Sequence, residues 1–285
     1  QDEETGQQYK YFAFEGIEKG SFIEYYYVVR KDPDYQGNKL MFQSSIEKSN
    51  VEFDLFSPQH LLFKFKSYND LPAVVMDTLT TGKLHYKLRV EELPKMENEV
   101  ASAYNASRAS VVYKLDQNLL NNSRNISSYG NVAQNIYAFY YPEHSKRSLK
   151  KLEDFVSKAT AKAGKDEASI LRSLDFYIKT NVYMTEGNSA ELQDLEKVLE
   201  QKVGNDTGLM KLYTASLELL DIKHEIVLTS NRQELKFDKE FEANNFLTDF
   251  LIYFPDTKSY LSPDDYSSRY GFPPAYLTDN YGLFI

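Results

Sequence analysis

The spacing of apolar residues changes once along this chain of 285 residues, and the change separates two kinds of structure. Before residue 90, short runs rich in β-branched and aromatic residues alternate with turn residues such as Gly, Asn, Asp and Pro. After residue 128, apolar residues recur with the 3.6-residue period of a helix. The first pattern is typical of antiparallel strands and the second of amphipathic helices. The sequence therefore predicts an α+β protein with a β-rich N-terminal part.

The N-terminal part has enough predicted strands for an antiparallel β-sandwich-like domain. One of them, Ser21–Arg30, is apolar or aromatic on both faces, as expected of a central strand. The other predicted strands are Tyr9–Phe14, Leu40–Ile46, Val51–Phe56, His60–Lys66, Val74–Thr78 and Lys83–Val90.

The C-terminal part combines predicted helices with strands that follow them. Segment 91–122 is polar and irregular, so we place the domain boundary there. We expect a β-rich domain over 1–115, a linker over 116–127 and an α+β domain over 128–285. The helices are expected near 132–140, 152–156, 166–180, 192–201 and 207–220, and the strands at 225–229, 247–254 and 259–261.

Composition excludes several classes of function. The chain has 33 basic and 42 acidic residues, a net charge of −9, which disfavours binding to nucleic acid or to an anionic membrane surface. It has no cysteine, so disulfides and thiolate metal sites are excluded, and its four widely spaced histidines argue against a zinc site. No apolar run reaches the ~20 residues of a membrane span. We expect no cofactor and no membrane insertion.

Several runs between Glu167 and Leu261 resemble the core of transglutaminase-like domains, which belong to the papain-like cysteine protease superfamily. The segments that carry the resemblance are Tyr177–Tyr183 at a helix end, Leu195–Gly204 before an apolar helix, the strand Glu225–Leu228, Phe250–Pro255 and Tyr260–Pro263. The last two resemble the strands that hold the family's histidine and aspartate. The resemblance implies a papain-like fold in the C-terminal domain.

The family's catalytic residues are replaced at all three positions. Its chemistry needs a cysteine at a helix start, a histidine base and an orienting aspartate. By alignment with the family, these fall on Asp206, Asp249 and Ser262. No histidine follows His224, so a shift of the alignment cannot restore the triad. Because all three catalytic residues are replaced, the resemblance predicts a protein that is not an enzyme and has no catalytic residue.

Two interpretations of Asp206 remain open at this stage. As a helix cap, its carboxylate would accept the unpaired amides of the first turn. As one of a pair with Asp249, it could support glycoside hydrolysis at a separation of roughly 5–9.5 Å. With Asp264 and Asp265 added, the same carboxylates could bind Ca²⁺.

A remnant cleft could still hold a peptide, a protein segment or a glycan, or serve as a scaffold. Four tyrosines are candidates to line it, and packing in the core is the alternative role that we favour for each: Tyr183, Tyr213, Tyr253 and Tyr260. The alternative is a purely structural domain whose cleft is closed by large side chains.

The segment Tyr11–Tyr25 resembles the β-rich domain of unknown function that precedes such domains in large bacterial exported proteins. A Gly-Ser turn at Gly20 and Ser21, which enters an Ile-Glu-Tyr strand, carries this resemblance. It implies export to the periplasm or cell surface of a Gram-negative bacterium. Because that family has further strands before this point and more chain after it, it also implies an incomplete N-terminal sheet.

Overall fold

The structure is a computed structural model that describes residues 13–29, 37–77 and 82–285. The chain divides into two compact units, residues 1–33 and 34–285. Helices and antiparallel strands share the larger unit, which confirms the predicted α+β class.

The described part of the first unit, residues 13–29, contains turns but no strand. Its aromatic side chains are exposed, including Phe22 at 101% and Tyr26 at 92%. The prediction of a central strand over Ser21–Arg30 is therefore wrong for 21–29, because a strand needs a hydrogen-bonded neighbour as well as β-forming residues. Arg30 and residues 9–12 of the predicted strand Tyr9–Phe14 lie outside the described residues.

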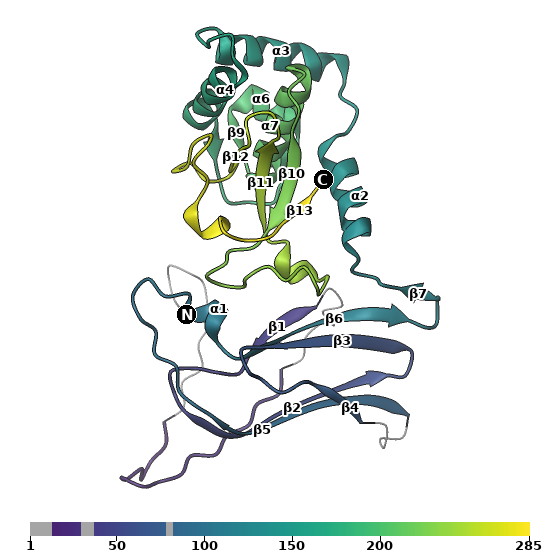
Figure 1. Ribbon diagram of the computed structural model, residues 1–285, viewed down its shortest axis with the longest axis vertical. Coiled ribbons are helices and arrows are strands. Elements are labelled where there is room, and N and C mark those ends of the chain that lie inside the picture. Colours follow the sequence, from purple (N-terminus) through teal and green to yellow (C-terminus); the bar gives the residue numbers. More distant parts are fainter. Residues whose placement is uncertain (1–12, 30–36, 78–81) are drawn as a thin grey trace. The chain divides into compact units, whose positions relative to one another are not determined.

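The larger unit begins with two antiparallel sheets (Figure 1). One sheet has the order β1-β6-β3, with β7 paired to β6, and the other has the order β2-β5-β4. Both contribute side chains to one apolar cluster, which includes Phe42, Leu88 and Val111. The strands are β1 (Asn38–Met41), β2 (Lys48–Pro58), β3 (Leu61–Tyr68), β4 (Val75–Asp77), β5 (Lys83–Leu93), β6 (Ser110–Asn118) and β7 (Ser123–Arg124). Each predicted strand between residues 40 and 90 overlaps one of them.

Strand β6 lies in the segment that we predicted to be irregular. Its two faces contact different apolar clusters, since Val111 packs between the sheets and Val112 packs against Phe237 and Phe246. Charged residues hid this strand from the sequence pattern: Lys114 and Asp116 are both buried, and Asp116 forms a 3.1 Å ion pair with Lys64. The predicted linker 116–127 contains the end of β6 and all of β7, and the division into domains stays a prediction.

The C-terminal part packs helices on a third antiparallel sheet with the order β12-β11-β10-β13. Its strands are β10 (Glu225–Thr229), β11 (Asp249–Phe254), β12 (Ser259–Leu261) and β13 (Leu283–Phe284), and β8 (Tyr183–Met184) pairs in parallel with β9 (Val203–Gly204). The helices are α1 (Tyr104–Ser107), α2 (Tyr129–Tyr140), α3 (Lys146–Thr160), α4 (Glu167–Asn181), α5 (Ala190–Gln193), α6 (Leu195–Gln201) and α7 (Asp206–Leu219), with short 3-10 helices at Asn244–Phe246 and Ala275–Leu277.

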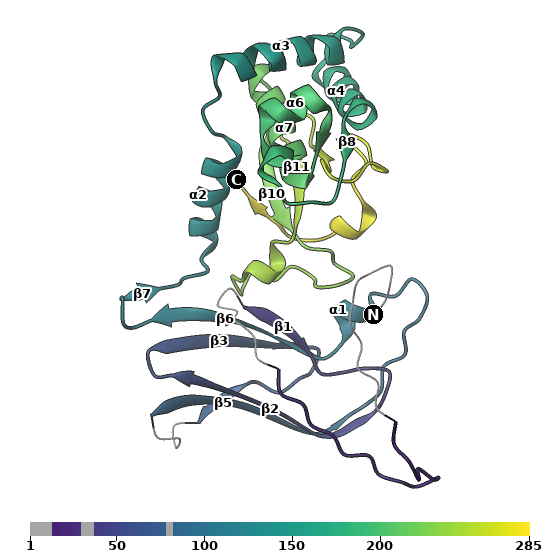
Figure 2. The same cartoon turned by 180° about the vertical axis from the view of Figure 1, so that it is seen from behind.

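Alternation along these strands produces two apolar faces. Ile226 and Ile252 pack with α7 in the main core, and Figure 2 shows α6 and α7 over that face. Val227 and Leu251 point to the opposite face, where they form a smaller cluster with Leu277. Because both faces are covered, β10 and β11 read as continuous apolar runs rather than as alternating ones.

The loop between β10 and β11 packs against the β1-β6-β3 sheet. Phe237 and Phe246 of the loop are buried with Val112 of β6. Tyr68 donates a hydrogen bond of 2.7 Å to Oδ2 of Asp238, which also pairs with Lys66. The β-rich part therefore holds the loop that leads into β11. Within the described ranges, none of the helices combines the length and apolar character needed to cross a bilayer.

Candidate functional site

An open hollow of about 650 Å³ lies at the start of α7. One wall is β8 with the loop that follows it, residues 183–188. Asn205 and Asp206 form the part at the helix start, and Asp264 enters from the segment after β12. This is the place where the transglutaminase-like resemblance puts the nucleophile.

Asn205 fixes the start of α7. Its side-chain oxygen accepts a 3.0 Å hydrogen bond from the Gly208 amide, and its side-chain nitrogen donates a 2.8 Å bond to the Gly187 carbonyl. Asn205 is therefore the helix cap and also ties the helix to the wall of the hollow. A Cβ at Gly208 would lie 2.0 Å from the Leu192 carbonyl oxygen, so glycine is needed for the close approach of residues 190–194.

Asp206 is the first helical residue, and Asn205 occupies the N-cap position that the capping interpretation gave to Asp206. Its side chain is exposed, and its Oδ1 accepts a 2.7 Å bond from the Thr207 amide. The carboxylate still lies at the positive end of the helix dipole. An exposed anion at a helix start is open to a ligand.

Asp264 is the most buried carboxyl group of the hollow. Its Oδ1 accepts a 2.9 Å hydrogen bond from the Ser262 hydroxyl, which is itself buried. Burial raises the pKa of Asp264, the Ser262 bond opposes that rise, and the nearby charges of Asp249 and Asp206 add to it. The serine at the family's aspartate position thus holds Asp264, which sequence reasoning had considered only as a cation ligand.

Asp249 does not line the hollow. As the first residue of β11 it alternates with Leu251 and Tyr253, on the sheet face opposite α7. Its Oδ2 accepts hydrogen bonds from the Asn231 amide at 3.1 Å and the Thr248 hydroxyl at 2.6 Å. The expected pair of Asp206 and Asp249 is therefore replaced in the hollow by Asp206 and Asp264.

One of the four tyrosines expected in the cleft lines it. Tyr183 borders the hollow and is 68% exposed. Tyr213 is fully buried and donates a 2.8 Å bond to Asp175, so of its two candidate roles it has the one in the core. Tyr253 and Tyr260 pack against each other, with ring centroids 4.8 Å apart, on the face opposite α7. Strand alternation, which the sequence pattern did not resolve, separates them from the hollow.

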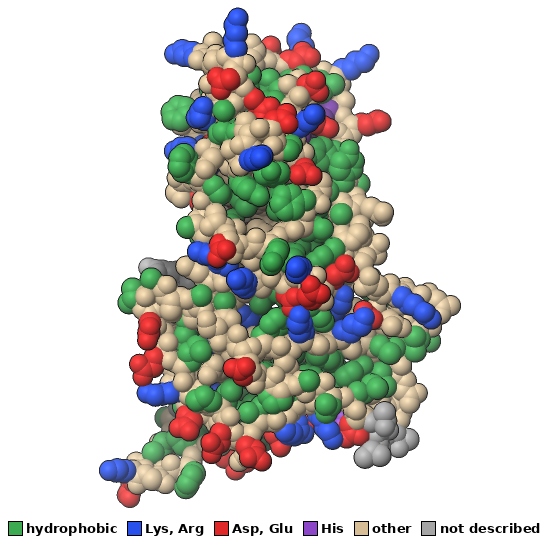
Figure 3. Space-filling model, in the orientation of Figure 1, with side chains coloured by type: hydrophobic (Ala, Val, Ile, Leu, Met, Phe, Trp, Pro, Cys, Tyr) green, Lys and Arg blue, Asp and Glu red, His purple; other side chains and the backbone are tan. Residues whose placement is uncertain are grey.

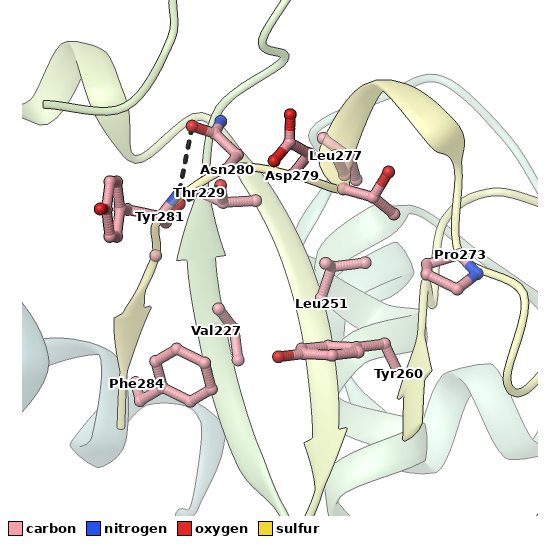
Figure 4. Close-up of a pocket in the computed structure, with 12 residues that line it drawn as sticks. Val227, Thr229, Leu251, Tyr260, Pro273, Leu277, Asp279, Asn280, Tyr281 and Phe284 are labelled. Atoms are coloured by element: carbon pink, nitrogen blue, oxygen red, sulfur yellow. Dashed lines mark hydrogen bonds between the residues drawn. The ribbon is translucent and has the colours of Figure 1, made fainter. Parts of the chain in front are cut away.

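Tyr260 lines a different pocket of about 140 Å³ on that opposite face (Figure 4). Figure 4 shows Val227 and Leu251 pointing into it from β10 and β11, with Thr229 near one end. In Figure 3, hydrophobic side chains gather over the sheet region on this side. The pocket is too small for more than a short apolar group, and the triad-derived positions lie outside it.

Tyr140 contacts the first turn of α7 and was missed by sequence reasoning. Its phenol hydrogen-bonds the Thr207 side chain, and burial raises its pKa to about 12. Its ring packs edge-on against Phe250, with centroids 5.6 Å apart. Tyr140 is therefore a neutral hydrogen-bonding group beside the helix start. Nothing in the sequence distinguishes it from the other apolar residues of α2.

The described residues contain no group of three or more His, Cys, Asp or Glu side chains arranged to hold a metal ion. The geometry therefore gives no support to the Ca²⁺ alternative. What the hollow offers instead is two exposed carboxylates, Glu186 and Asp206, a shielded carboxyl group, an exposed tyrosine and strand backbone.

Comparison with solved structures finds a protein of similar fold. A crystal structure of a "putative protease" from Parabacteroides distasonis ATCC 8503 matches with a TM-score of 0.57 and 15% identity, over 85% of this chain and 46% of that chain. The chain thus spans about half the length of that protein. At 15% identity, this match shows a shared fold and no more.

Two further structures match less closely. One is a TGase, with a TM-score of 0.31, 9% identity and coverage of 74% of this chain and 46% of that chain. The other is a "putative cysteine protease" from Cytophaga hutchinsonii, with a TM-score of 0.29, 13% identity and coverage of 77% and 82%. The fold assignment rests on the first structure alone. The sequence matches no protein-family model and no curated protein.

Proposed function

We propose that this chain is a non-catalytic transglutaminase-like protein that binds an extended peptide bearing basic side chains. The observation that carries the proposal is the hollow itself: an open, acidic site at the start of α7, in a chain without any cysteine. A thiolate nucleophile is impossible in such a chain. The open hollow also favours binding over the alternative of a closed, purely structural domain.

The side chains of the hollow favour a cationic ligand. Glu186, Asp206 and Asp264 line it, and none of its described lining residues is Lys or Arg. The exposed ring of Tyr183 can pack against the stem or the charged end of a Lys or Arg side chain. A site of one charge sign attracts ligands of the opposite sign and selects against acidic ones.

The backbone of β8 favours an extended ligand. Tyr183 and Thr185 donate their amides to the Lys202 and Gly204 carbonyls of the neighbouring strand segment, at 2.7 and 3.0 Å. Alternation along the strand turns the amide and carbonyl of Met184 away from β9. A peptide can add there as a further strand while its side chains reach the acidic groups.

Fluorescence anisotropy with a labelled peptide of alternating Ala and Lys tests the proposal. We expect saturable binding that is at least tenfold weaker in the double variant Asp206→Asn/Asp264→Asn. The exposed pair Glu153 and Asp154 on α3 supplies a control with the same change of net charge, Glu153→Gln/Asp154→Asn, which should bind like the wild type. Equal loss in both variants would mean nonspecific attraction and would overturn the proposal. Saturable binding of a neutral oligosaccharide to the wild type, without binding of the peptide, would assign the hollow to a glycan.

A carboxylate-based hydrolase is the second candidate, and the raised pKa of Asp264 beside the exposed Asp206 is what favours it. In that function Asp264 would donate a proton and Asp206 would be the second carboxyl group of the pair. Hydrolysis of a peptide or glycan by the wild type, abolished by Asp264→Asn, would establish it in place of the binding function.

We also propose, from the resemblance of residues 11–25, that the chain belongs to an exported bacterial protein and that its β-rich part is a sandwich-like domain. Cell fractionation of the native host tests the first point. Recovery of the full-length protein in the cytoplasm would contradict it.

A further inference from the structure

A charged cluster is buried in the core of the C-terminal part. Asp175 and Lys179 lie one turn apart on α4, with their side chains each 1% exposed and 3.1 Å between Nζ and Oδ1. Their neighbours on the same helix, Leu171, Leu174 and Ile178, belong to the apolar core. The same environment could accommodate apolar residues, so the presence of two charges needs a reason.

Each charge of the pair is fully engaged by other elements. Oδ1 of Asp175 accepts a 2.8 Å bond from the Tyr213 hydroxyl of α7, and Oδ2 accepts a 2.8 Å bond from the Tyr270 amide. Nζ of Lys179 donates to the carbonyl and the hydroxyl of Ser268, at 3.1 and 3.3 Å. Two helices and segment 268–270 therefore meet at one ion pair.

Such a pair adds little net stability compared with apolar residues of similar volume. Desolvation of both charges opposes their attraction, and burial lowers the pKa of Lys179 while Asp175 partly restores it. What an ion pair adds is geometric specificity, because its hydrogen bonds form in only one arrangement of the partner groups. The partners here are backbone groups of an irregular segment that lacks a strand or helix of its own.

That segment continues directly from the hollow. Asp264 precedes it, and Asp265 closes its turn by accepting bonds from the amides of Ser267 and Ser268, at 2.8 and 3.2 Å. The Tyr266 hydroxyl donates a 2.7 Å bond to the carbonyl of Val182, the residue before β8. The end of α4 thus leads into one wall of the hollow while its buried charges hold the segment that carries Asp264.

We infer that the buried Asp175–Lys179 pair is a positioning device that fixes segment 264–270 and so sets the place of Asp264 opposite β8. Lys179 and Asp175 act through Ser268 and Tyr270 and do not touch the hollow themselves. The pair therefore couples the core of the domain to the geometry of its acidic site.

Two readouts on the variant Lys179→Met test this role. We expect hydrogen exchange at the Tyr270 amide to accelerate at least tenfold relative to the Ile226 amide of β10, and the NMR titration midpoint of the Asp264 carboxyl to fall toward its ordinary value as the group becomes more exposed. Lys151→Met is the control, because Lys151 forms ion pairs with Glu196 and Glu200 far from this segment in sequence. It should leave both readouts unchanged.

A merely structural role would give a different result: Lys179→Met would lower the melting temperature while the relative exchange at Tyr270 and the Asp264 titration stayed as in the wild type. If Lys179→Met does not fold, Tyr213→Phe, which removes one hydroxyl from the cluster, should produce the same two changes to a smaller degree. Unchanged values in Tyr213→Phe would then overturn the inference. Neither readout needs a ligand. A failed peptide-binding experiment would therefore overturn the proposed function and leave the test of the Asp175–Lys179 pair unaffected.

Discussion

The buried Asp175–Lys179 cluster and the hollow at the start of α7 are two polar sites in one α+β frame, and they treat their charges differently. In the cluster the two opposite charges pair with each other and bond to Tyr213, Ser268 and Tyr270. In the hollow, Asp206 and Asp264 accept bonds from Thr207 and Ser262, but across the described ranges neither has an ion-pair partner. The two charges buried in the core are paired with each other. The carboxyl groups of the hollow have no cationic partner among the described residues and remain available to a ligand.

The largest expected effect comes from breaking the buried Asp175–Lys179 pair. Lys179→Met leaves Asp175 buried without its cation, and we expect the free energy of unfolding in urea to fall by about 3–5 kcal/mol. Lys151→Met, which removes a partly exposed cation from a surface network of ion pairs, should cost much less. Similar losses in the two variants would contradict the view that the buried pair is distinct from surface pairs.

Gly208→Ala tests the close approach at the edge of the hollow. The new Cβ would meet the Leu192 carbonyl at 2.0 Å, so we expect a loss of about 1–3 kcal/mol and increased hydrogen exchange over 190–194. Gly130→Ala on α2 is the matched change, because a Cβ there meets nothing within 4 Å. Thermal unfolding should show Gly130→Ala to be neutral or stabilising by about 0.5–1 kcal/mol. A stabilising effect of Gly208→Ala would refute the clash.

The assignment of the cap to Asn205 gives the next effect in size. Asn205→Ala should reduce stability by about 0.5–2 kcal/mol, since it leaves the Gly208 amide without its acceptor and frees the Gly187 carbonyl. Asp206→Asn should change stability much less, because Asp206 is exposed and is not the cap. Chemical denaturation of both variants decides the point, and the opposite order would restore Asp206 as the capping residue.

The smallest expected effect is a pH dependence of stability that arises from Asp264 in the hollow. Because the pKa of Asp264 is raised in the folded state, the folded protein holds this proton to higher pH than the unfolded chain does. Between the two pKa values stability therefore falls as pH rises, and the cost persists at neutral pH. Asp264→Asn should remove this slope and raise the melting temperature slightly at pH 7, whereas Asp154→Asn should not. An unchanged slope in Asp264→Asn would show that the hollow does not shield this carboxyl group.

The predicted elements that the structure confirms are those whose stability is encoded locally. The helices near 132–140 and 166–180 and the strands 225–229 and 259–261 follow from apolar periodicity and turn residues, and they form as expected. The resemblance, which is carried by the residues before and after α7, placed the nucleophile position just after segment 195–204. The hollow lies at that place in the structure.

The features that sequence reasoning missed depend on what each residue packs against. Strand β6 contains Lys114 and Asp116, whose burial depends on partners far away in the chain. The exposed segment 21–29 has strand-forming residues but no neighbouring strand, and propensity alone does not supply one. Asn205 and Asp206 are adjacent polar residues, and only the backbone geometry shows which of them caps the helix.

The exchange of Asp249 for Asp264 has the same origin. Strand alternation places Asp249 on the face opposite α7, and the turn after Ser262 brings Asp264 into the hollow. A sequence alignment shows neither the sheet face on which Asp249 lies nor the turn that brings Asp264 into the hollow.

The measurement that tests the central claim most directly is mass spectrometry of the Ala-Lys peptide recovered after prolonged incubation with saturating wild-type protein. The hollow should bind the peptide and return it with its mass unchanged, and Asp206→Asn/Asp264→Asn should retain less of it. A shortened or cross-linked peptide that appears with the wild type and is absent with Asp264→Asn would contradict the account and establish a catalytic site.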